Sequence, residues 1–164
     1  MDIKEYINKL TDTEFEELCT EYLKIRFKDK NIQVHGTRLK KDGGKDVIGK
    51  SKDVPYEIWA ECKRHNRSIG LDTISKNVIL VISKGINELI FFSTSNITKN
   101  ALKHISIVAA KHDFSVSFIY GKRLYKELNL LPRFQIDINS LFKTAKDTLE
   151  ISRFFSLFED SEQY

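Results

Sequence analysis

The chain has 164 residues and a mass of 19.1 kDa, the size of one ordinary domain, with a mild net charge of +4. Hydrophobic residues make up 41% and charged residues 30%, and two prolines with seven glycines exclude a collagen-like or linker-rich chain. Two cysteines make no disulfide framework, no Cys/His spacing is typical of zinc, and no apolar run suits a membrane, so we expect a cytoplasmic protein.

The first part of the chain predicts two helices followed by strands. A short helix over 3–10 precedes a longer one, which the pattern Thr11-Asp-Thr-Glu14 opens as a capping box. The apolar face of this second helix recurs at helical spacing and consists of Phe15, Leu18, Cys19, Tyr22 and Leu23. A strand then starts over 32–35, and a polar loop follows to Gly44. Residues 46–48 and 56–63 are expected to pair as a hairpin around 51–54.

The second part alternates helices and strands. Leu71, Ile74, Val78 and Ile82 fit one helix, and the continuous apolar run over 89–92 is typical of a strand buried on both faces. Asn96 or Thr98 caps another helix with its apolar side chains facing inward; these are Ala101, Leu102, Ile105, Val108 and Ala109. A last strand over 114–120 and a short helix from Gly121 complete an α/β fold, a mixed central sheet flanked by helices.

After Pro132 the pattern changes. Phenylalanines and aliphatic residues recur at roughly helical spacing over 141–158 in a polar background. We therefore expect one domain over 1–132 and a helical extension over 133–164. Clustered phenylalanines need a cover. We expect that cover to be a second subunit, as in a homodimer, or a continuation of a longer protein.

The segment Gly44–Ser51 matches the phosphate-binding loop pattern G-x-x-x-x-G-K-[ST]. That motif needs a buried strand before it and a helix after it, so that backbone amides face the phosphates. Here polar residues precede it, and Pro55 stops a helix from forming after it. We expect no nucleotide site here.

The strand over 56–63 carries a more informative pattern. Side chains alternate along a strand, so Ile58, Ala60 and Cys62 belong to the core face, and Trp59, Glu61 and Lys63 share the other face. In the expected hairpin Asp46 lies nearly opposite Trp59 and diagonal to Glu61, about 7–8 Å away. Two such carboxylates suit a shared Mg²⁺ or Mn²⁺, with Lys63 beside it. The same alternation is also compatible with a surface ion pair between Glu61 and Lys63.

Positive charge gathers around these carboxylates. Nine basic and five acidic residues lie between Arg38 and Arg67, so this window alone accounts for the net charge of the chain. Such a window suits a polyanion near a bound metal, and it is equally compatible with a solvated lysine-rich loop. The candidate nucleic-acid-binding residues are Lys40, Lys41, Lys45, Arg64 and Arg67.

Together these residues resemble a known family. Asp42-Gly-Gly-Lys-Asp46 followed by Glu61-Cys-Lys63 is similar to the signature of the PD-(D/E)xK nucleases in its Mrr-like restriction endonuclease form. The likeness covers about residues 11–130 in the right order, with further matching stretches at Thr13–Leu18, Phe92–Ser95 with Asn100-Ala101, and Ile119–Leu124. Two positions depart from the family pattern: Lys45 replaces the proline of the family name, and Glu61 stands where many Mrr-like members have glutamine.

The resemblance implies a restriction-endonuclease-like fold with an αβββαβ core and assigns a role to each site residue. Asp46 and Glu61 would hold a divalent metal and Lys63 would be the catalytic lysine. The main-chain carbonyl of Cys62 is implied as a further ligand. Glu16 is an additional candidate ligand, and its position beside the apolar face of its helix agrees with this role.

The implied function is a Mg²⁺-dependent endonuclease that hydrolyses DNA phosphodiester bonds in a restriction or antiviral defence system, with Mn²⁺ able to substitute. As part of such a system, the chain is expected to act as a homodimer or as one domain of a larger protein. Two alternatives remain open at this stage. One is a DNA-binding module with the same fold that does not cleave, and the other is a nuclease that acts on RNA.

Overall fold

The strands form one mixed sheet in the order β1-β2-β3-β4-β5. A computed structural model describes residues 2–37 and 45–135. The strands are β1 (Ile32–Gly36), β2 (Val47–Ser51), β3 (Glu57–Lys63), β4 (Glu88–Ser93) and β5 (Ser115–Tyr120). β1, β2 and β3 pair antiparallel, whereas β3, β4 and β5 pair parallel. The expected mixed central sheet is therefore present.

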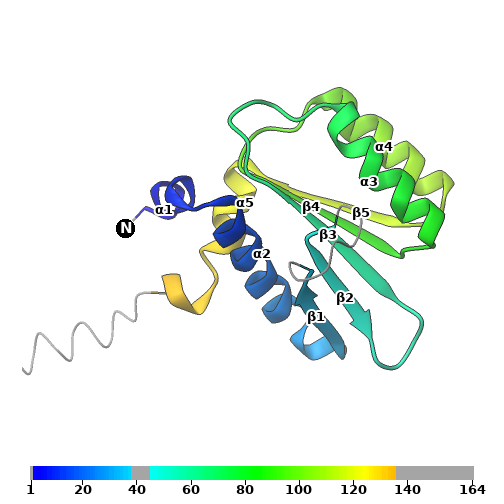
Figure 1. Ribbon diagram of the computed structural model, residues 1–164, viewed down its shortest axis with the longest axis horizontal. Helices are drawn as coiled ribbons and strands as arrows, with labels where there is room; N and C mark the ends of the chain where they lie inside the picture. Colours follow the sequence, from blue (N-terminus) through cyan, green and yellow to red (C-terminus); the bar gives the residue numbers. More distant parts are fainter. Residues whose placement is uncertain (1, 38–44, 136–164) are drawn as a thin grey trace, which may run out of the picture. The chain divides into compact units, whose positions relative to one another are not determined.

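Helices cover both faces of this sheet (Figure 1). The helices are α1 (Ile3–Lys9), α2 (Asp12–Arg26), α3 (Leu71–Lys84), α4 (Lys99–Lys111) and α5 (Gly121–Leu128). α2 and α5 lie on one face, where Tyr22 meets Phe92 of β4 edge-on at 5.9 Å. α3 and α4 lie on the other face, where Ile74 and Val78 share a hydrophobic cluster with Trp59 of β3.

The start of α2 forms as its sequence predicts. The Thr11 hydroxyl accepts a hydrogen bond from the Glu14 amide at 3.2 Å, and the Glu14 carboxylate accepts one from the Thr11 amide at 2.7 Å. This reciprocal capping satisfies two amides that have no partner inside the helix. All five residues of the predicted apolar face are buried; they are Phe15, Leu18, Cys19, Tyr22 and Leu23. Burial of each large apolar side chain stabilises the fold by about 1.5–3 kcal/mol.

Strand β4, between β3 and β5, is buried along its whole length, as its continuous apolar run predicts. Helix α4 begins after Thr98, whose hydroxyl accepts a hydrogen bond from the Ala101 amide at 3.2 Å. In α3, Val81 is fully buried in place of the expected Ile82, because the stripe follows Ile74, Val78 and Val81. Within residues 2–37 and 45–135, no helix has the length and apolar character needed to cross a membrane.

The hairpin between β2 and β3 has a different register from the predicted one. Ile48 pairs with Trp59, so the expected pairing of Asp46 opposite Trp59 was wrong by two residues. The reason is the turn: the Ser51 amide donates to the Tyr56 carbonyl, so the turn spans 52–55, one residue later than expected. A shift of two residues keeps every side chain on its predicted face.

The end of the phosphate-loop match is a strand that leads into a turn. Gly49-Lys50-Ser51, the end of the phosphate-loop match, lies on β2 and leads into the turn before β3, so no helix follows it. The chain divides into two units, 1–131 and 132–164. Of the second unit only 132–135 are described, with a 3₁₀ turn at Pro132–Phe134. Most of the expected helical extension lies outside the described residues.

Candidate active site

Asp46 is held at the start of β2 by bonds to both neighbouring strands. Its amide donates to the Ala60 carbonyl at 3.0 Å, and its carbonyl accepts from the Thr37 amide at 2.9 Å. Its side-chain Oδ2 accepts a 2.6 Å hydrogen bond from the Cys62 amide of β3. The β2–β3 pairing ends at Val47 with Ala60, and the Asp46 amide bonds to the carbonyl of this same Ala60. The Asp46 carboxylate lies near enough to Glu61 for its charge to raise the pKa of that carboxyl group.

Glu61 is a carboxylate with little access to water, since only 3% of its surface is exposed. One carboxylate oxygen, Oε1, pairs with the Lys63 ammonium group. The other, Oε2, accepts a 2.9 Å hydrogen bond from Asn77 of α3. A surface ion pair of little consequence is therefore the wrong description of this contact.

The charges of the site perturb one another. Burial and the nearby charge of Asp46 raise the pKa of Glu61 to about 7, although Lys63 and Asn77 oppose this shift. Burial likewise raises the pKa of Asp46, and the Cys62 amide and the Lys63 charge offset this only in part. A strongly perturbed carboxyl group such as that of Glu61 is typical of functional sites.

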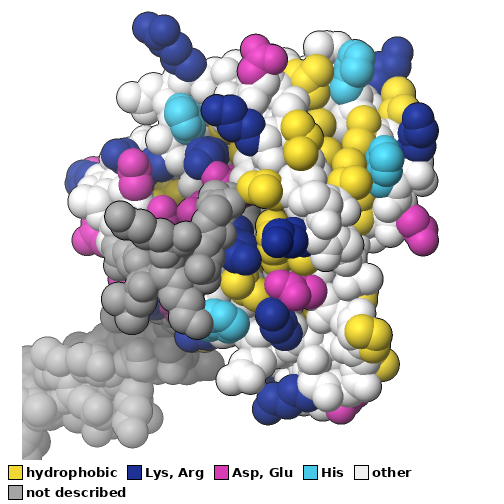
Figure 2. Space-filling model, turned by 45° about the vertical axis from the view of Figure 1, so that its right-hand side comes forward, with side chains coloured by type: hydrophobic (Ala, Val, Ile, Leu, Met, Phe, Trp, Pro, Cys, Tyr) yellow, Lys and Arg dark blue, Asp and Glu magenta, His cyan; other side chains and the backbone are white. Residues whose placement is uncertain are grey.

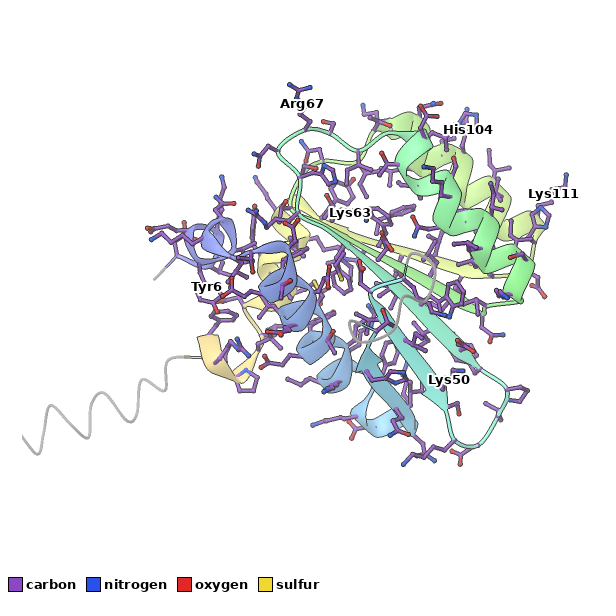
Figure 3. All side chains as sticks on the ribbon, viewed as in Figure 1. Tyr6, Lys50, Lys63, Arg67, His104 and Lys111 are labelled. Carbon is purple, nitrogen blue, oxygen red and sulfur yellow. The ribbon has the colours of Figure 1, made fainter. Side chains whose placement is uncertain are left out.

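Lys63 stays positively charged. Burial alone would lower the pKa of its ammonium group, but the hydrogen bond and charge of Glu61, with the charge of Asp46, raise the pKa overall. Its side chain, at the end of β3 in Figure 3, is 31% exposed and so is reachable from the solvent. Lys63 therefore acts at neutral pH as a cation and hydrogen-bond donor.

Glu61 and Lys63 line a groove of about 600 Å³ between β3 and α3. From β3 come Glu61 and Lys63, and from α3 come Asp72, Thr73, Lys76, Asn77 and Leu80. The contribution of α3 was missed in the sequence. The sequence does contain a signal for it. Polar residues lie beside the buried stripe of α3, and among them Asn77 follows Thr73 by one turn.

Cys62 serves the site through its backbone. Its side chain is buried, and burial together with Cys19 of α2 raises the pKa of the Cys62 thiol, so the thiol stays protonated. Its amide fixes the Asp46 carboxylate. Glu16 is half-buried on α2, where its carbonyl accepts from the Thr20 hydroxyl at 2.8 Å. The roles of the Cys62 carbonyl and of Glu16 as metal ligands stay predictions.

The candidate nucleic-acid-binding residues are distributed around the site. The Lys45 ammonium lies 4.1 Å from the centre of the Trp59 ring, a cation–π contact next to Asp46. Arg64 follows Lys63 and pairs with Asp12 at 2.9 Å, and Arg67 is exposed in the loop after β3 (Figure 3). Lys40 and Lys41 lie outside the described residues. Lysine and arginine side chains are spread over the face shown in Figure 2, with acidic ones between them.

The donor chemistry of this site fits a hard divalent cation. Within the described part of the chain, no three His, Cys, Asp or Glu side chains gather into a ready metal site. The two carboxylates of Asp46 and Glu61 nevertheless lie close enough for the charge of one to raise the pKa of the other. Such a pair is relieved by a cation between its members, and oxygen ligands favour Mg²⁺ or Mn²⁺.

Comparison with known proteins agrees with this arrangement. The family model described as "Restriction endonuclease" (Mrr_cat) matches residues 7–128, and the chain belongs to this family of nucleases. The matched segment contains all of β1 to β5 and the three residues Asp46, Glu61 and Lys63. No curated protein sequence shows a significant match to this chain.

Two solved structures are similar to this chain. One is the MspJI restriction endonuclease in complex with a 27-mer oligonucleotide, with 16% identity and a TM-score of 0.57, covering 88% of this chain and 34% of that one. The other is a protein of unknown function, AF1548, with 13% identity and a TM-score of 0.46, covering 64% of this chain and 58% of that one. The chain thus spans about a third of MspJI, and that likeness shows the fold.

Proposed function

We propose that this protein is a metal-dependent endonuclease that hydrolyses phosphodiester bonds of DNA, with Asp46, Glu61 and Lys63 as its catalytic residues. The observation that supports this proposal best is the arrangement around Glu61. A buried carboxylate bonded to Lys63, with a second carboxylate acting on it, lies in an open groove. This arrangement is costly for a purely structural role, because burial of charges in low dielectric is unfavourable. The same arrangement of carboxylates and lysine suits a site that binds a metal cation and a phosphate next to each other.

The proposed metal ligands are Asp46, Glu61 and the main-chain carbonyl of Cys62, with Glu16 as an additional candidate. When bound, Mg²⁺ or Mn²⁺ would stabilise charge on the phosphoryl oxygens and lower the pKa of a coordinated water. Groups of the protein itself orient the two carboxylates. The Cys62 amide keeps the Asp46 carboxylate aimed at the site. Asn77 holds one oxygen of Glu61, so that the carboxylate keeps one orientation.

Lys63 has a separate role. Since the raised pKa of its ammonium keeps it charged, it does not remove a proton from water at neutral pH. It instead donates hydrogen bonds to the attacking water or to a phosphoryl oxygen, where its charge offsets the negative charge of the transition state. Glu61 holds this ammonium group through an ion pair. The Lys63 side chain remains 31% exposed and lines the groove, so a substrate phosphate bound there would reach its ammonium group.

The proposed partner is DNA, and the proposed setting is restriction or antiviral defence. Membership of the restriction endonuclease family supports both, as does the fold shared with MspJI, whose structure contains an oligonucleotide. We further propose that the chain works as a homodimer or within a larger protein.

The experiment is plasmid cleavage with Mg²⁺ or Mn²⁺ by the wild type, Asp46→Ala and Lys63→Ala. Each variant should lose about 100-fold or more in rate, because each removes a group that acts on the transition state. Lys103→Ala, at an exposed position on α4, is the matched lysine control and should keep full activity. Equal cleavage by all four proteins would overturn the proposal. Running a single-stranded RNA of matched sequence in parallel decides whether DNA is the preferred substrate.

A further inference from the structure

A second cavity lies at the carboxyl ends of the parallel strands. Its volume is about 620 Å³, and it does not share a lining residue with the groove of Glu61 and Lys63. The segments that follow β3, β4 and β5 all contribute to it, and α1 closes one side. In open α/β sheets, this crevice outside the carboxyl ends of strands is where ligands bind.

The lining of this cavity is polar and positively charged. Three of its residues are cations, Lys4, Arg64 and Lys122, and none is acidic. Most of the others are asparagine, serine and threonine, and the aromatic ones are His65 and Tyr125. Sites for drug-sized molecules are mostly apolar. Phosphate and sugar groups of a nucleic-acid strand, in contrast, are contacted by these polar and basic side chains.

Part of this positive charge has no counterpart. Among residues 2–37 and 45–135, neither the Lys4 nor the Lys122 ammonium forms an ion pair, whereas Arg64 is paired with the exposed Asp12. Asp2 lies nearby: its carboxylate accepts from the Lys4 amide and its charge acts on Tyr125. Burial, with this charge, raises the pKa of Tyr125, so its hydroxyl stays protonated as a donor.

Hydrogen bonds between the segments after β3 and β4 hold the rim of the cavity in place. The Thr94 hydroxyl accepts from the His65 amide at 3.0 Å and donates to the His65 carbonyl at 3.1 Å. The Thr94 amide donates to the Lys63 carbonyl at 3.1 Å, and the Ile69 amide donates to the Asn96 carbonyl at 2.8 Å. The loops after β3 and β4 are thereby joined, so the cavity is formed before any ligand arrives.

The cavity and the groove of the candidate active site are lined by consecutive residues at the end of β3. Lys63 and Arg64 are consecutive residues, with Cα atoms about 3.8 Å apart. Lys63 lines the groove of Glu61, and Arg64 lines the second cavity. The Lys63 side chain lies with Glu61 on the α3 side, whereas Arg64 pairs with Asp12 of α2. A strand whose scissile phosphate lies at Lys63 would therefore have to bend around the carboxyl end of β3 to place a neighbouring phosphate at Arg64.

We propose that this cavity is a phosphate-binding subsite for the nucleic-acid strand, in which Lys4 and Lys122 join Arg64 in holding a phosphate other than the scissile one. The proposal rests on the proposed nuclease function for the identity of the strand. It assigns affinity and strand placement to residues of α1 and α5, outside the groove that performs the chemistry.

The test measures binding of a short fluorescent DNA duplex in EDTA, so that no cleavage takes place. Lys4→Glu/Lys122→Glu is compared with Lys103→Glu/Lys111→Glu, a pair on α4 with the same change in charge (Lys111 is labelled in Figure 3). The cavity pair should raise Kd about tenfold or more. It should also reduce the slope of log Kd against log salt concentration by about two, because two phosphate contacts are lost. The α4 pair should change Kd by less than about threefold, because the distant charges are screened by salt.

The outcomes are decisive in both directions. Equal weakening by the two pairs, or no weakening by the cavity pair, overturns the subsite. Duplexes with and without a 5′ phosphate distinguish the source: an effect confined to the phosphorylated duplex assigns a strand end, and an equal effect assigns an internal phosphate.

If the wild type binds DNA through this cavity but never cleaves with Mg²⁺ or Mn²⁺, the nuclease function fails and the subsite stands. If the wild type cleaves DNA but the cavity pair and the α4 pair bind DNA with equal Kd, the nuclease function stands and the subsite fails.

Discussion

The side-chain amide of Asn77 on α3 donates a 2.9 Å hydrogen bond to the buried carboxylate of Glu61 on β3. Through this bond a helix on one face of the sheet orients a site residue of the central strand. Asn77 is a positioning residue, since it acts on the proposed chemistry only through Glu61. It links the packing of α3 to the electrostatics of the site.

Replacement of Asn77 by alanine should weaken metal binding and slow cleavage. The hydrogen bond from Asn77 lowers the pKa of Glu61, so its loss raises that pKa further and favours the protonated, non-ligating form at pH 7. Calorimetric titration with Mn²⁺ should give a Kd about 3–10-fold higher than that of the wild type, consistent with the loss of one bond to a charged group. Asn100→Ala, at an exposed position of α4, should leave the Kd unchanged. A purely structural role for Asn77 would lower the melting temperature without this shift in Kd.

The metal-free protein should lose stability as pH rises through the range where Glu61 titrates. The pKa of Glu61 is about 7 in the folded protein and about 4.3 in an unfolded chain, so the folded state binds the extra proton between these values. Its contribution is most favourable below pH 4.3 and is lost progressively up to about pH 7, at about 1.4 kcal/mol for each pKa unit. Urea unfolding in EDTA should show that Glu61→Gln lacks this loss. A difference between wild type and variant that is constant from pH 5 to pH 8 would contradict the assignment.

Addition of Mg²⁺ or Mn²⁺ should stabilise the protein more at pH 8 than at pH 6. The cation and the proton compete for the same carboxylates, and binding to the folded state raises its stability. Thermal unfolding with and without the metal should therefore show a larger increase in melting temperature at the higher pH. Asp46→Ala should remove the increase at both pH values, whereas Asp113→Ala, in the turn after α4, should retain it. An equal increase in wild type and Asp46→Ala would place the cation elsewhere.

Trp59 offers a direct probe of Lys45, because it is the only tryptophan of the chain and its ring lies 4.1 Å from the Lys45 ammonium. A nucleic-acid phosphate that binds Lys45 should draw the ammonium off the ring and change the tryptophan fluorescence. Titration with a DNA duplex in EDTA should show this change in the wild type and in Lys52→Ala, an exposed residue of the hairpin turn. Lys45→Ala should lose most of it. The same signal in all three proteins would exclude Lys45 as a phosphate contact.

Several parts of this protein could be predicted from local sequence. The capping box of Thr11 and Glu14 and the apolar stripe of α2 depend on residues within a few positions of each other. The shared face of Glu61 and Lys63 follows from the two-residue period of a strand, which holds whichever strand lies next to it. The order of helices and strands around Asp46, Glu61 and Lys63 was sufficient to indicate the restriction endonuclease family, to which the chain belongs.

Other features depended on contacts between distant segments. The register of β2 against β3 was set by a turn one residue later than expected, and the error of two residues means that Ile48, not Asp46, lies opposite Trp59. The burial of Glu61 depends on α3 lying over β3, and its bond to Asn77 joins residues 16 positions apart. Likewise, only folding brings Lys4 and Lys122 to one cavity beside Arg64. Periodicity and capping act over one or two turns of chain, so sequence alone determined the elements and the three charged residues. Burial and electrostatic coupling depend on which surfaces meet in space, so the tertiary structure alone decided how those charges are held.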